Sequence, residues 1–197
     1  YFGITDESGV DLKDSENLTP DQIAKRLSVH RRVDFIIEKM NYYGHDGLKR
    51  KALGFCMTIA HAEFMAEEFN KRGIPSIALS GGDKVSKRES YTKLLEAEDS
   101  DLEVIFTVDI FNEGIDIPGV NLVMMLRPTQ SSIVFTQQLG RGLRKKDNKE
   151  FLTVLDFIGN YSKSFLIAIA LNGRRFYDKD SVKTSVKRNF SDLPGAT

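Results

Sequence analysis

The sequence predicts an α/β domain whose open, mostly parallel sheet carries helices on both faces. From residue 52 onward, short apolar runs alternate with segments of helical period, which is the pattern of parallel strands joined by crossover helices. The helical segments also have start and stop residues, such as Thr58 before one helix and Gly73 after it. The expected architecture therefore has three layers, with the sheet between two layers of helices.

Size and charge narrow the class of protein. The 197 residues can bury a sizeable core, and Lys plus Arg equals Asp plus Glu at 28 each, so any attraction to nucleic acid must be local. No apolar run approaches the length of a membrane span and no signal-peptide pattern opens the chain, which favours a cytoplasmic protein. A single cysteine, Cys56, fits a reducing compartment. Because the chain begins with Tyr1 and not Met, we expect a piece of a longer protein.

The chain divides into three predicted parts. Residues 1–48 form an irregular lead-in, to about residue 18, and then a helix that starts at the capping box of Thr19 and Gln22 and bends near His30. Residues 49–172 form the α/β domain, and residues 173–197 form a basic tail toward a missing C-terminal region. Within the domain, strands are predicted at 52–57, 74–79, 102–107, 120–126 and 151–157, and helices at 58–72, 85–97, 132–144 and 161–172.

The predicted helix at residues 132–144 presents a polar face with two arginines. Successive helical residues turn by about 100°, which brings Gln137, Arg141 and Arg144 within roughly 60° of one another, while apolar residues share the opposite side. No carboxylate lies within four residues of Arg141. Two like charges one helical turn apart repel each other unless a nearby anion compensates them. Taken alone, such a face is more often simply solvated.

The loop after the predicted strand at 102–107 is the second candidate. In open α/β sheets ligands bind beyond the carboxyl ends of the strands. This loop, VDIFNEGIDIPGV, carries several carboxylates, and Gly114 lets its backbone turn or approach a ligand. Thr107 and free backbone amides could hold a phosphate. Equally, Asp116 could belong to a simple turn and Asp109 could cap a helix.

Together these patterns resemble a known family. The order strand, T-x-D-x-x-x-E-G-I-D-I-P, strand, Q-x-x-G-R-x-x-R resembles motifs V and VI of superfamily 2 helicases and translocases. The upstream ALGFCMT and HAEFMAEEF resemble motif IV, and ALSG resembles the small motif after it. The resemblance covers residues 50–157. It is closest to the bacterial DEAD/DEAH-type group related to the motor subunits of type I and type III restriction enzymes.

The resemblance implies the second, C-terminal RecA-like domain of a two-domain motor driven by ATP. Arg141 and Arg144 would be arginine fingers that reach ATP bound on the first domain and stabilise the transferring phosphoryl group. Gln137 would orient that pair or the attacking water. Gly140 would allow close approach of the domains, and Gly114 and Asp116 match positions beside the ATP ribose.

Further positions match contacts to nucleic acid. Thr58 and Thr107 correspond to residues whose hydroxyls and adjacent helix amides hold phosphates, and Ser80 lies in the small motif. Arg127, at another carboxyl end, could contact nucleic acid or could shape the turn. Double-stranded DNA is the expected partner, because Glu113 stands where RNA-directed DEAD-box members carry arginine and motif VI opens with Gln137.

Half of a nucleotide site is missing. The sequence contains no G-x-x-x-x-G-K-[ST] and no D-E-x-[DH], so ATP and its Mg²⁺ would be held by the N-terminal motor domain of the same chain, absent here. These residues alone are expected to show no ATPase activity and weak, salt-sensitive DNA binding. The alternative is a catalytically inert RecA-like module that binds nucleic acid or protein. An unrelated doubly wound metabolic enzyme would need a glycine-rich phosphate loop that the sequence lacks.

The cysteine and histidines give no metal site. Cys56 lies in an apolar strand and is interpreted as a small buried hydrophobe. His30, His45 and His61 are scattered, with no cysteine or carboxylate at ligand spacing, so no structural zinc is predicted. His61 is expected to support the helix cap at Thr58.

Overall fold

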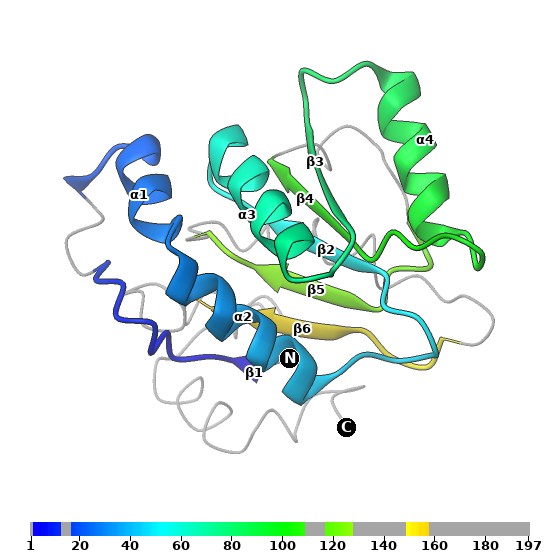
Figure 1. Cartoon of the computed structure of the whole chain (residues 1–197), viewed down its shortest axis with the longest axis horizontal. Helices are drawn as coiled ribbons and strands as arrows, with labels where there is room; N and C mark the ends of the chain where they lie inside the picture. Colours follow the sequence, from blue (N-terminus) through cyan, green and yellow to red (C-terminus); the bar gives the residue numbers. More distant parts are fainter. Residues whose placement is uncertain (1, 13–16, 109–116, 128–148, 158–197) are drawn as a thin grey trace, which may run out of the picture.

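A computed structural model describes residues 2–12, 17–108, 117–127 and 149–157. These residues form one six-stranded sheet in the order β1-β6-β5-β2-β4-β3, in which every neighbouring pair is parallel (Figure 1). The predicted α/β class with a parallel sheet is confirmed. The strands are β1 (Phe2–Gly3), β2 (Ala52–Phe55), β3 (Ser76–Ser80), β4 (Val104–Val108), β5 (Leu122–Met125) and β6 (Thr153–Asp156), and the helices are α1 (Pro20–Leu27), α2 (His30–Tyr43), α3 (Ile59–Lys71) and α4 (Val85–Glu96).

The carboxyl ends of the central strands lie level with one another. Phe55 at the end of β2 pairs with Thr107 of β4 on one side and with Met125 of β5 on the other. Met125 in turn pairs with Asp156, the last residue of β6. Segments that leave these four strands therefore start from the same edge of the sheet, which is where ligands bind in folds of this type.

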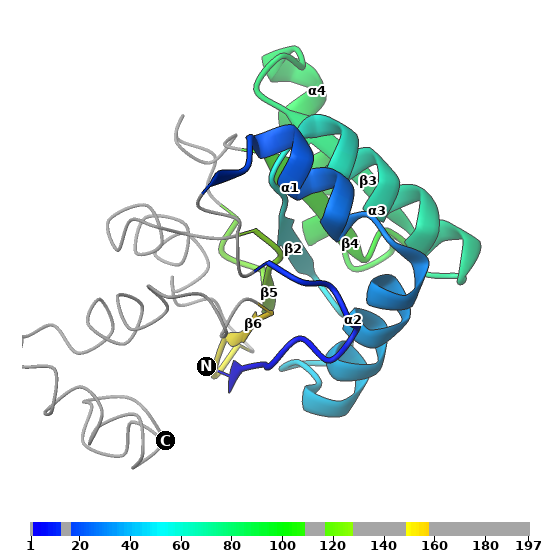
Figure 2. The same cartoon turned by 90° about the vertical axis from the view of Figure 1, so that its left-hand side faces the viewer.

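Helices cover both faces of the sheet. Successive strand residues point to opposite faces: Ala52 and Cys56 belong to the core cluster beneath α2 and α3, whereas Leu53 and Phe55 belong to the cluster that includes Leu95 of α4. Figures 1 and 2 show α2 and α3 side by side on one face. The predicted three-layer arrangement is thus present.

The prediction of an irregular lead-in is wrong at its first residues. Phe2 and Gly3 form β1, which pairs with Leu155 and Asp156 of β6. The ring of Phe2 also stacks on Tyr43 at the end of α2, with 4.2 Å between centroids. Two residues are too few to show the alternating pattern of a strand, so the pairing comes from the tertiary structure. Ile4 joins the same core cluster as α2, which shows that the N-terminal segment packs on the α/β core.

The predicted N-terminal helix is two helices, and the break falls just before the expected bend at His30. The capping box is confirmed, since Thr19 and Gln22 exchange both bonds at the start of α1. At the other end the Ser28 hydroxyl donates to the carbonyl of Ala24 at 2.8 Å, and Val29 adopts an extended backbone. A serine side chain that bonds a carbonyl of the last turn competes with continuation of the helix. The predicted helices at 132–144 and 161–172 lie outside the described residues.

One buried amide joins the amino ends of the strands. The Asn121 side chain donates to the carbonyls of Asp46 and Lys49, at 2.6 and 2.7 Å, and accepts from the Lys51 amide at 2.9 Å. Asn121 is 5% exposed. Loss of a partner from buried polar groups costs about 1–3 kcal/mol. We therefore expect Asn121→Ala to lower the free energy of unfolding in urea by about 2 kcal/mol.

Asn41→Ala is the matched control. Its exposed amide accepts a single bond, from Arg50, so the loss should stay within about 0.5 kcal/mol. Equal losses for the two variants would contradict the role given to Asn121.

Candidate functional site at the carboxyl edge

The four described residues that were predicted to bind nucleic acid lie at one edge of the sheet. Thr107 belongs to the end of β4, Ser80 ends β3, and Thr58 and Arg127 follow β2 and β5 within a few residues. The level strand ends place all four segments along the carboxyl edge (Figure 1). The other predicted residues lie outside the described part of the chain, in the stretches that follow β4 and β5: Gly114, Asp116, Gln137, Gly140, Arg141 and Arg144.

Thr58 caps the N-terminus of α3, as predicted. Its hydroxyl oxygen accepts from the His61 amide at 3.2 Å, so its hydrogen is still available to donate. The first amides of a helix lack partners within the helix, and the helix dipole adds a partial positive charge there. Ile59, the first helical residue, is 49% exposed. An anion could therefore approach this end of α3, which is the local chemistry of a phosphate site.

His61 supports the cap from the buried side. Its Nδ1 accepts from the Met57 amide at 3.3 Å, which leaves the proton on Nε2. Burial, reinforced by the charge of Arg32, lowers the pKa of His61 to about 3. The imidazole is therefore neutral at physiological pH and acts as a hydrogen-bond acceptor. The predicted role of His61 in the cap is consistent with these contacts.

Ser80 lies in a turn in which its amide and its hydroxyl are both already hydrogen-bonded. Its amide and its hydroxyl both donate to one oxygen of Asp83, at 2.7 and 3.2 Å. The other oxygen of Asp83 accepts from Lys87 at 2.6 Å. The bond from Lys87, followed by that from the Ser80 amide, lowers the pKa of the Asp83 carboxyl. In this arrangement the Ser80 hydroxyl has already used its hydrogen, and Asp83 holds the turn between β3 and α4.

Thr107 differs from Thr58 in exposure. Its side chain is 0% exposed, and its hydroxyl oxygen has no hydrogen-bond partner among the described residues. Phe106 points into the cluster beneath α2 and α3, so Thr107 points to the α4 face. The exposure that a direct phosphate contact needs is present at Thr58 and absent at Thr107.

Cys56 and Arg127 lie close enough to interact electrostatically. Cys56 is fully buried, as predicted, and burial raises the pKa of its thiol while the charges of Arg32 and Arg127 act in the opposite direction. The thiol is therefore protonated and packs as a small apolar group. Arg127, two residues after the end of β5, is half-buried.

Arg32 is not among the predicted site residues, yet it is the largest fully buried side chain in the described part of the chain. It is 0% exposed, and its Nε donates to an Asp6 oxygen at 2.8 Å. Burial lowers the pKa of Arg32, and the charge and hydrogen bond of Asp6 oppose that shift. The sequence does hold a signal, because Arg32 lies on the buried stripe of α2 with Val33, Ile36 and Met40.

The described residues contain neither a candidate membrane span nor a candidate metal site. No helix among them is long and apolar enough to cross a membrane. Nor does this part of the chain contain a group of three His, Cys, Asp or Glu residues that could hold a metal ion.

Comparison with known proteins identifies the family. Residues 32–146 match the family model described as helicase conserved C-terminal domain. IRC3 of Saccharomyces cerevisiae, whose name describes an ATP-dependent helicase, is 30% identical over 129 residues, which are 66% of this chain and 18% of IRC3. The type I restriction enzyme EcoKI endonuclease subunit of Escherichia coli is 30% identical over 137 residues, 64% of this chain and 12% of that subunit. The chain thus spans less than a fifth of either relative.

A solved structure shows the same fold. Domain 2 of the DEAD-box helicase Mss116p, bound to an RNA duplex, matches with a TM-score of 0.53 and 18% identity, over 82% of this chain and 64% of that chain. The matched residues, the parallel sheet and the resemblance to superfamily 2 motifs agree. This chain belongs to the family of helicase conserved C-terminal domains and has a RecA-like fold.

Proposed function

We propose that this chain is the second motor domain of an ATP-dependent translocase or helicase that acts on double-stranded DNA. The alignment of the carboxyl ends of β2, β4, β5 and β6 at one edge of the sheet supports the proposal most directly. Thr58 and the N-terminus of α3 offer a phosphate site at that edge. The segments with the motif V and motif VI residues follow β4 and β5 in the chain, two strands whose ends lie on either side of the end of β2.

In this proposal the chain completes a nucleotide site and does not build one alone. The sequence has no Walker lysine and no magnesium-binding acidic box, so ATP and Mg²⁺ belong to an N-terminal motor domain. Arg141 and Arg144 stabilise the negative charge that spreads over the transferring phosphoryl group. Gln137 orients that arginine pair or the attacking water.

The remaining residues position the partners. Gly140, without a side chain, lets the two domains approach closely, and Gly114 and Asp116 face the ATP ribose. Thr58 contacts a phosphate of the tracked strand, with Ser80, Thr107 and Arg127 in supporting positions along the same edge. Closure of the two domains on ATP and reopening after hydrolysis then move these contacts along the strand. Residues 49–172 carry this motor function, and residues 173–197 lead toward a further C-terminal region.

Double-stranded DNA is the favoured substrate for two reasons. One relative is a type I restriction enzyme subunit. In addition, Glu113 and Gln137 occupy positions at which RNA-directed DEAD-box proteins carry other residues. The fold alone does not decide between DNA and RNA, because the Mss116p domain of the same fold is bound to an RNA duplex.

The test is ATP hydrolysis by the full-length protein with duplex DNA, single-stranded DNA or duplex RNA. We expect duplex DNA to stimulate turnover most, and the 197-residue chain by itself to show none. Stimulation by RNA alone would overturn the substrate assignment. Binding to DNA without any ATP hydrolysis would favour the inert binding module.

A further inference from the structure

Residues 5–12, the acidic segment, lie along α2 and α1 without forming a helix or a strand of their own. The segment follows β1, which lies beside the end of α2. Its Asp6 accepts from Arg32, in the first turn of α2, at 2.8 Å. Further on, the carbonyl of Asp11 accepts from Arg26 of α1 at 3.1 Å. The acidic segment therefore runs antiparallel to α2 and on toward α1 (Figures 1 and 2).

The charges of the acidic segment and of the helices beside it are complementary. The segment has no lysine or arginine and carries three carboxylates, those of Asp6, Glu7 and Asp11. The neighbouring stretch of α1 and α2 carries three arginines, the arginine face: Arg26, Arg31 and Arg32. The guanidinium of Arg31 lies against Gly9, in the space that a side chain at Gly9 would need. Each of the three arginines thus contacts the acidic segment.

Arg32 is fully buried beside the acidic segment, and most of its hydrogen-bonding capacity is unused. A guanidinium has five N–H donors in a planar fork. Nε is paired with Asp6, while both Nη atoms are buried without an acceptor among the described residues. Buried donors without partners are unfavourable. A phosphate group offers oxygens that match the whole fork, so it would satisfy donors that Asp6 leaves unpaired.

The acidic segment is fastened at its start and has no strand pairing further on. Ile4 is buried in the core, and its amide donates to the carbonyl of Asp156 at 2.7 Å. Beyond Ile4, the amide and the hydroxyl of Ser8 donate to the Asp6 carboxylate. That turn lies within the segment and can move with it. Residues 5–12 can therefore leave the arginine face while β1 stays in the sheet.

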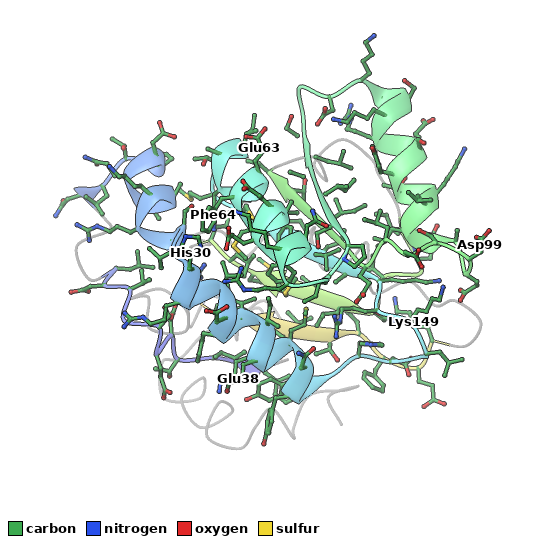
Figure 3. All side chains as sticks on the ribbon, viewed as in Figure 1. His30, Glu38, Glu63, Phe64, Asp99 and Lys149 are labelled. Atoms are coloured by element: carbon green, nitrogen blue, oxygen red, sulfur yellow. The ribbon has the colours of Figure 1, made fainter. Side chains whose placement is uncertain are left out.

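We propose that the arginine face is a binding site for the phosphate backbone of nucleic acid, and that the acidic segment occupies this site until nucleic acid displaces it. The inference rests on the proposed function, in which the protein acts on nucleic acid. Figures 1 and 3 show α1 and His30, at the start of α2, on the side of the domain to which the arrows of β5 and β6 point. The arginine face thus lies toward the carboxyl edge.

The acidic segment lowers the affinity for nucleic acid, because its carboxylates compete with phosphates for the same guanidinium groups. Displacement exchanges the pair of Asp6 with Arg32 for a phosphate contact that uses more of the fork. Arg26 and Arg31 are partly exposed at the rim of the site and add two further charges. The segment is then a built-in competitor that weakens binding without closing the site permanently.

The experiment measures the affinity of the full-length protein for a fluorescein-labelled DNA duplex by anisotropy, across a salt titration. The first variant combines Asp6→Asn, Glu7→Gln and Asp11→Asn, which removes the charge of the segment and keeps its size. We expect it to bind about tenfold more tightly near 0.1 M salt, since a unit charge about 10 Å from a phosphate has an effect of this order. The salt dependence should steepen by about one for each arginine that gains a phosphate.

Arg26→Gln with Arg31→Gln tests whether that gain comes from the arginine face. Both side chains are exposed, so the substitutions should leave the fold intact. Added to the neutralised segment, they should abolish most of the gain in affinity. Added to the wild-type segment, they should weaken binding by only about twofold, the scale of an exposed charge contact. The two sets of changes are therefore expected to be non-additive.

The matched control removes the same charge from the amino edge of the sheet, with Asp99→Asn, Asp101→Asn and Glu150→Gln. These carboxylates are exposed and precede β4 and β6. Figure 3 shows Asp99 on the opposite side of the domain from His30. We expect the affinity to change by less than about twofold at this ionic strength, because salt screens charges that lie farther than a Debye length from the DNA.

The outcomes separate a competing segment from a structural one. A gain in affinity that disappears with Arg26→Gln and Arg31→Gln supports the proposal. An unchanged affinity in the folded neutralised variant, a gain that persists without these arginines, or an equal gain in the control would overturn it. If the triple variant does not fold, Glu7→Gln with Asp11→Asn, both exposed, should give a smaller gain with the same dependence on the arginines.

Failure of this inference can be told from failure of the proposed function. A wild-type protein that does not bind DNA, and whose ATP hydrolysis DNA does not stimulate, would overturn both. Binding and stimulation by DNA in the wild type, without the coupled gain in the variants, would overturn this inference alone.

Discussion

Arg144→Lys in the full-length protein should lower DNA-stimulated ATP hydrolysis by about three orders of magnitude, and Arg141→Lys should have a comparable effect. Lysine keeps the positive charge, but it lacks the planar fork that binds two phosphoryl oxygens at once. The proposed arginine contacts stabilise the charge distribution of the transition state more than that of bound ATP, so kcat should fall more than the affinity for ATP. The measurement is the kcat of ATP hydrolysis at saturating duplex DNA.

Lys145→Ala is the control for this pair. Lys145 is the basic residue next to Arg144, outside the Q-x-x-G-R-x-x-R pattern, and its loss should leave kcat near the wild-type value. The affinity for DNA should also survive Arg144→Lys, because in the proposed function this arginine acts on the nucleotide. Wild-type turnover in both arginine variants would remove them from the catalytic site and leave the inert binding module as the better interpretation.

Gly54→Val should destabilise the domain by about 3 kcal/mol, at the upper end of the usual cost of overpacking. A Cβ added at Gly54 would lie 2.4 Å from Cδ1 and 2.6 Å from Cε1 of the Phe106 ring. That ring is fully buried and packs edge-on against Phe69 at 4.8 Å, so it has little room to move. The measurement is the midpoint and slope of urea unfolding.

Gly81→Val is the matched control for Gly54→Val. Gly81 lies in the exposed turn after β3, where an added Cβ would meet nothing within 4 Å, so its cost should stay within about 0.5 kcal/mol. Adding Phe106→Leu to Gly54→Val should recover part of the loss, because the two changes involve one contact. Similar losses at both glycines would contradict a steric origin.

Most of the sheet could be predicted from the sequence because its strands are short apolar runs between turn residues. The strand predicted at 74–79 is observed as Ser76–Ser80. The observed strand starts later than predicted, after Ile74 and Pro75. At its first residue, the Asn70 side chain forms hydrogen bonds with both the amide and the carbonyl of Ser76. Asn70 lies on the preceding helix, so this tertiary contact is not visible in the apolar pattern.

The candidate site was predictable where it depends on local chain chemistry. A threonine before a helix is a capping signal, and Thr58 does cap α3. The partnership of Asp6 with Arg32 was not predictable, because it joins the N-terminal segment to α2 and buries a residue type that is usually exposed. The bond from Ser80 to Asp83 is local, yet a serine before two glycines gives no sign that its hydroxyl is already engaged. The six nucleotide-facing residues of the resemblance stay predictions.

The pairing of β1 with β6 has a consequence for synthesis on the ribosome. Phe2 leaves the exit tunnel before its partner Leu155, which emerges only after all the other described strands have been made. The segment of β1 must therefore remain unpaired with β6 while the rest of this sheet is translated, and its contact closes one of the longest loops available to the fold. Among the described strands, the one that is synthesised first has to wait for the one that is synthesised last.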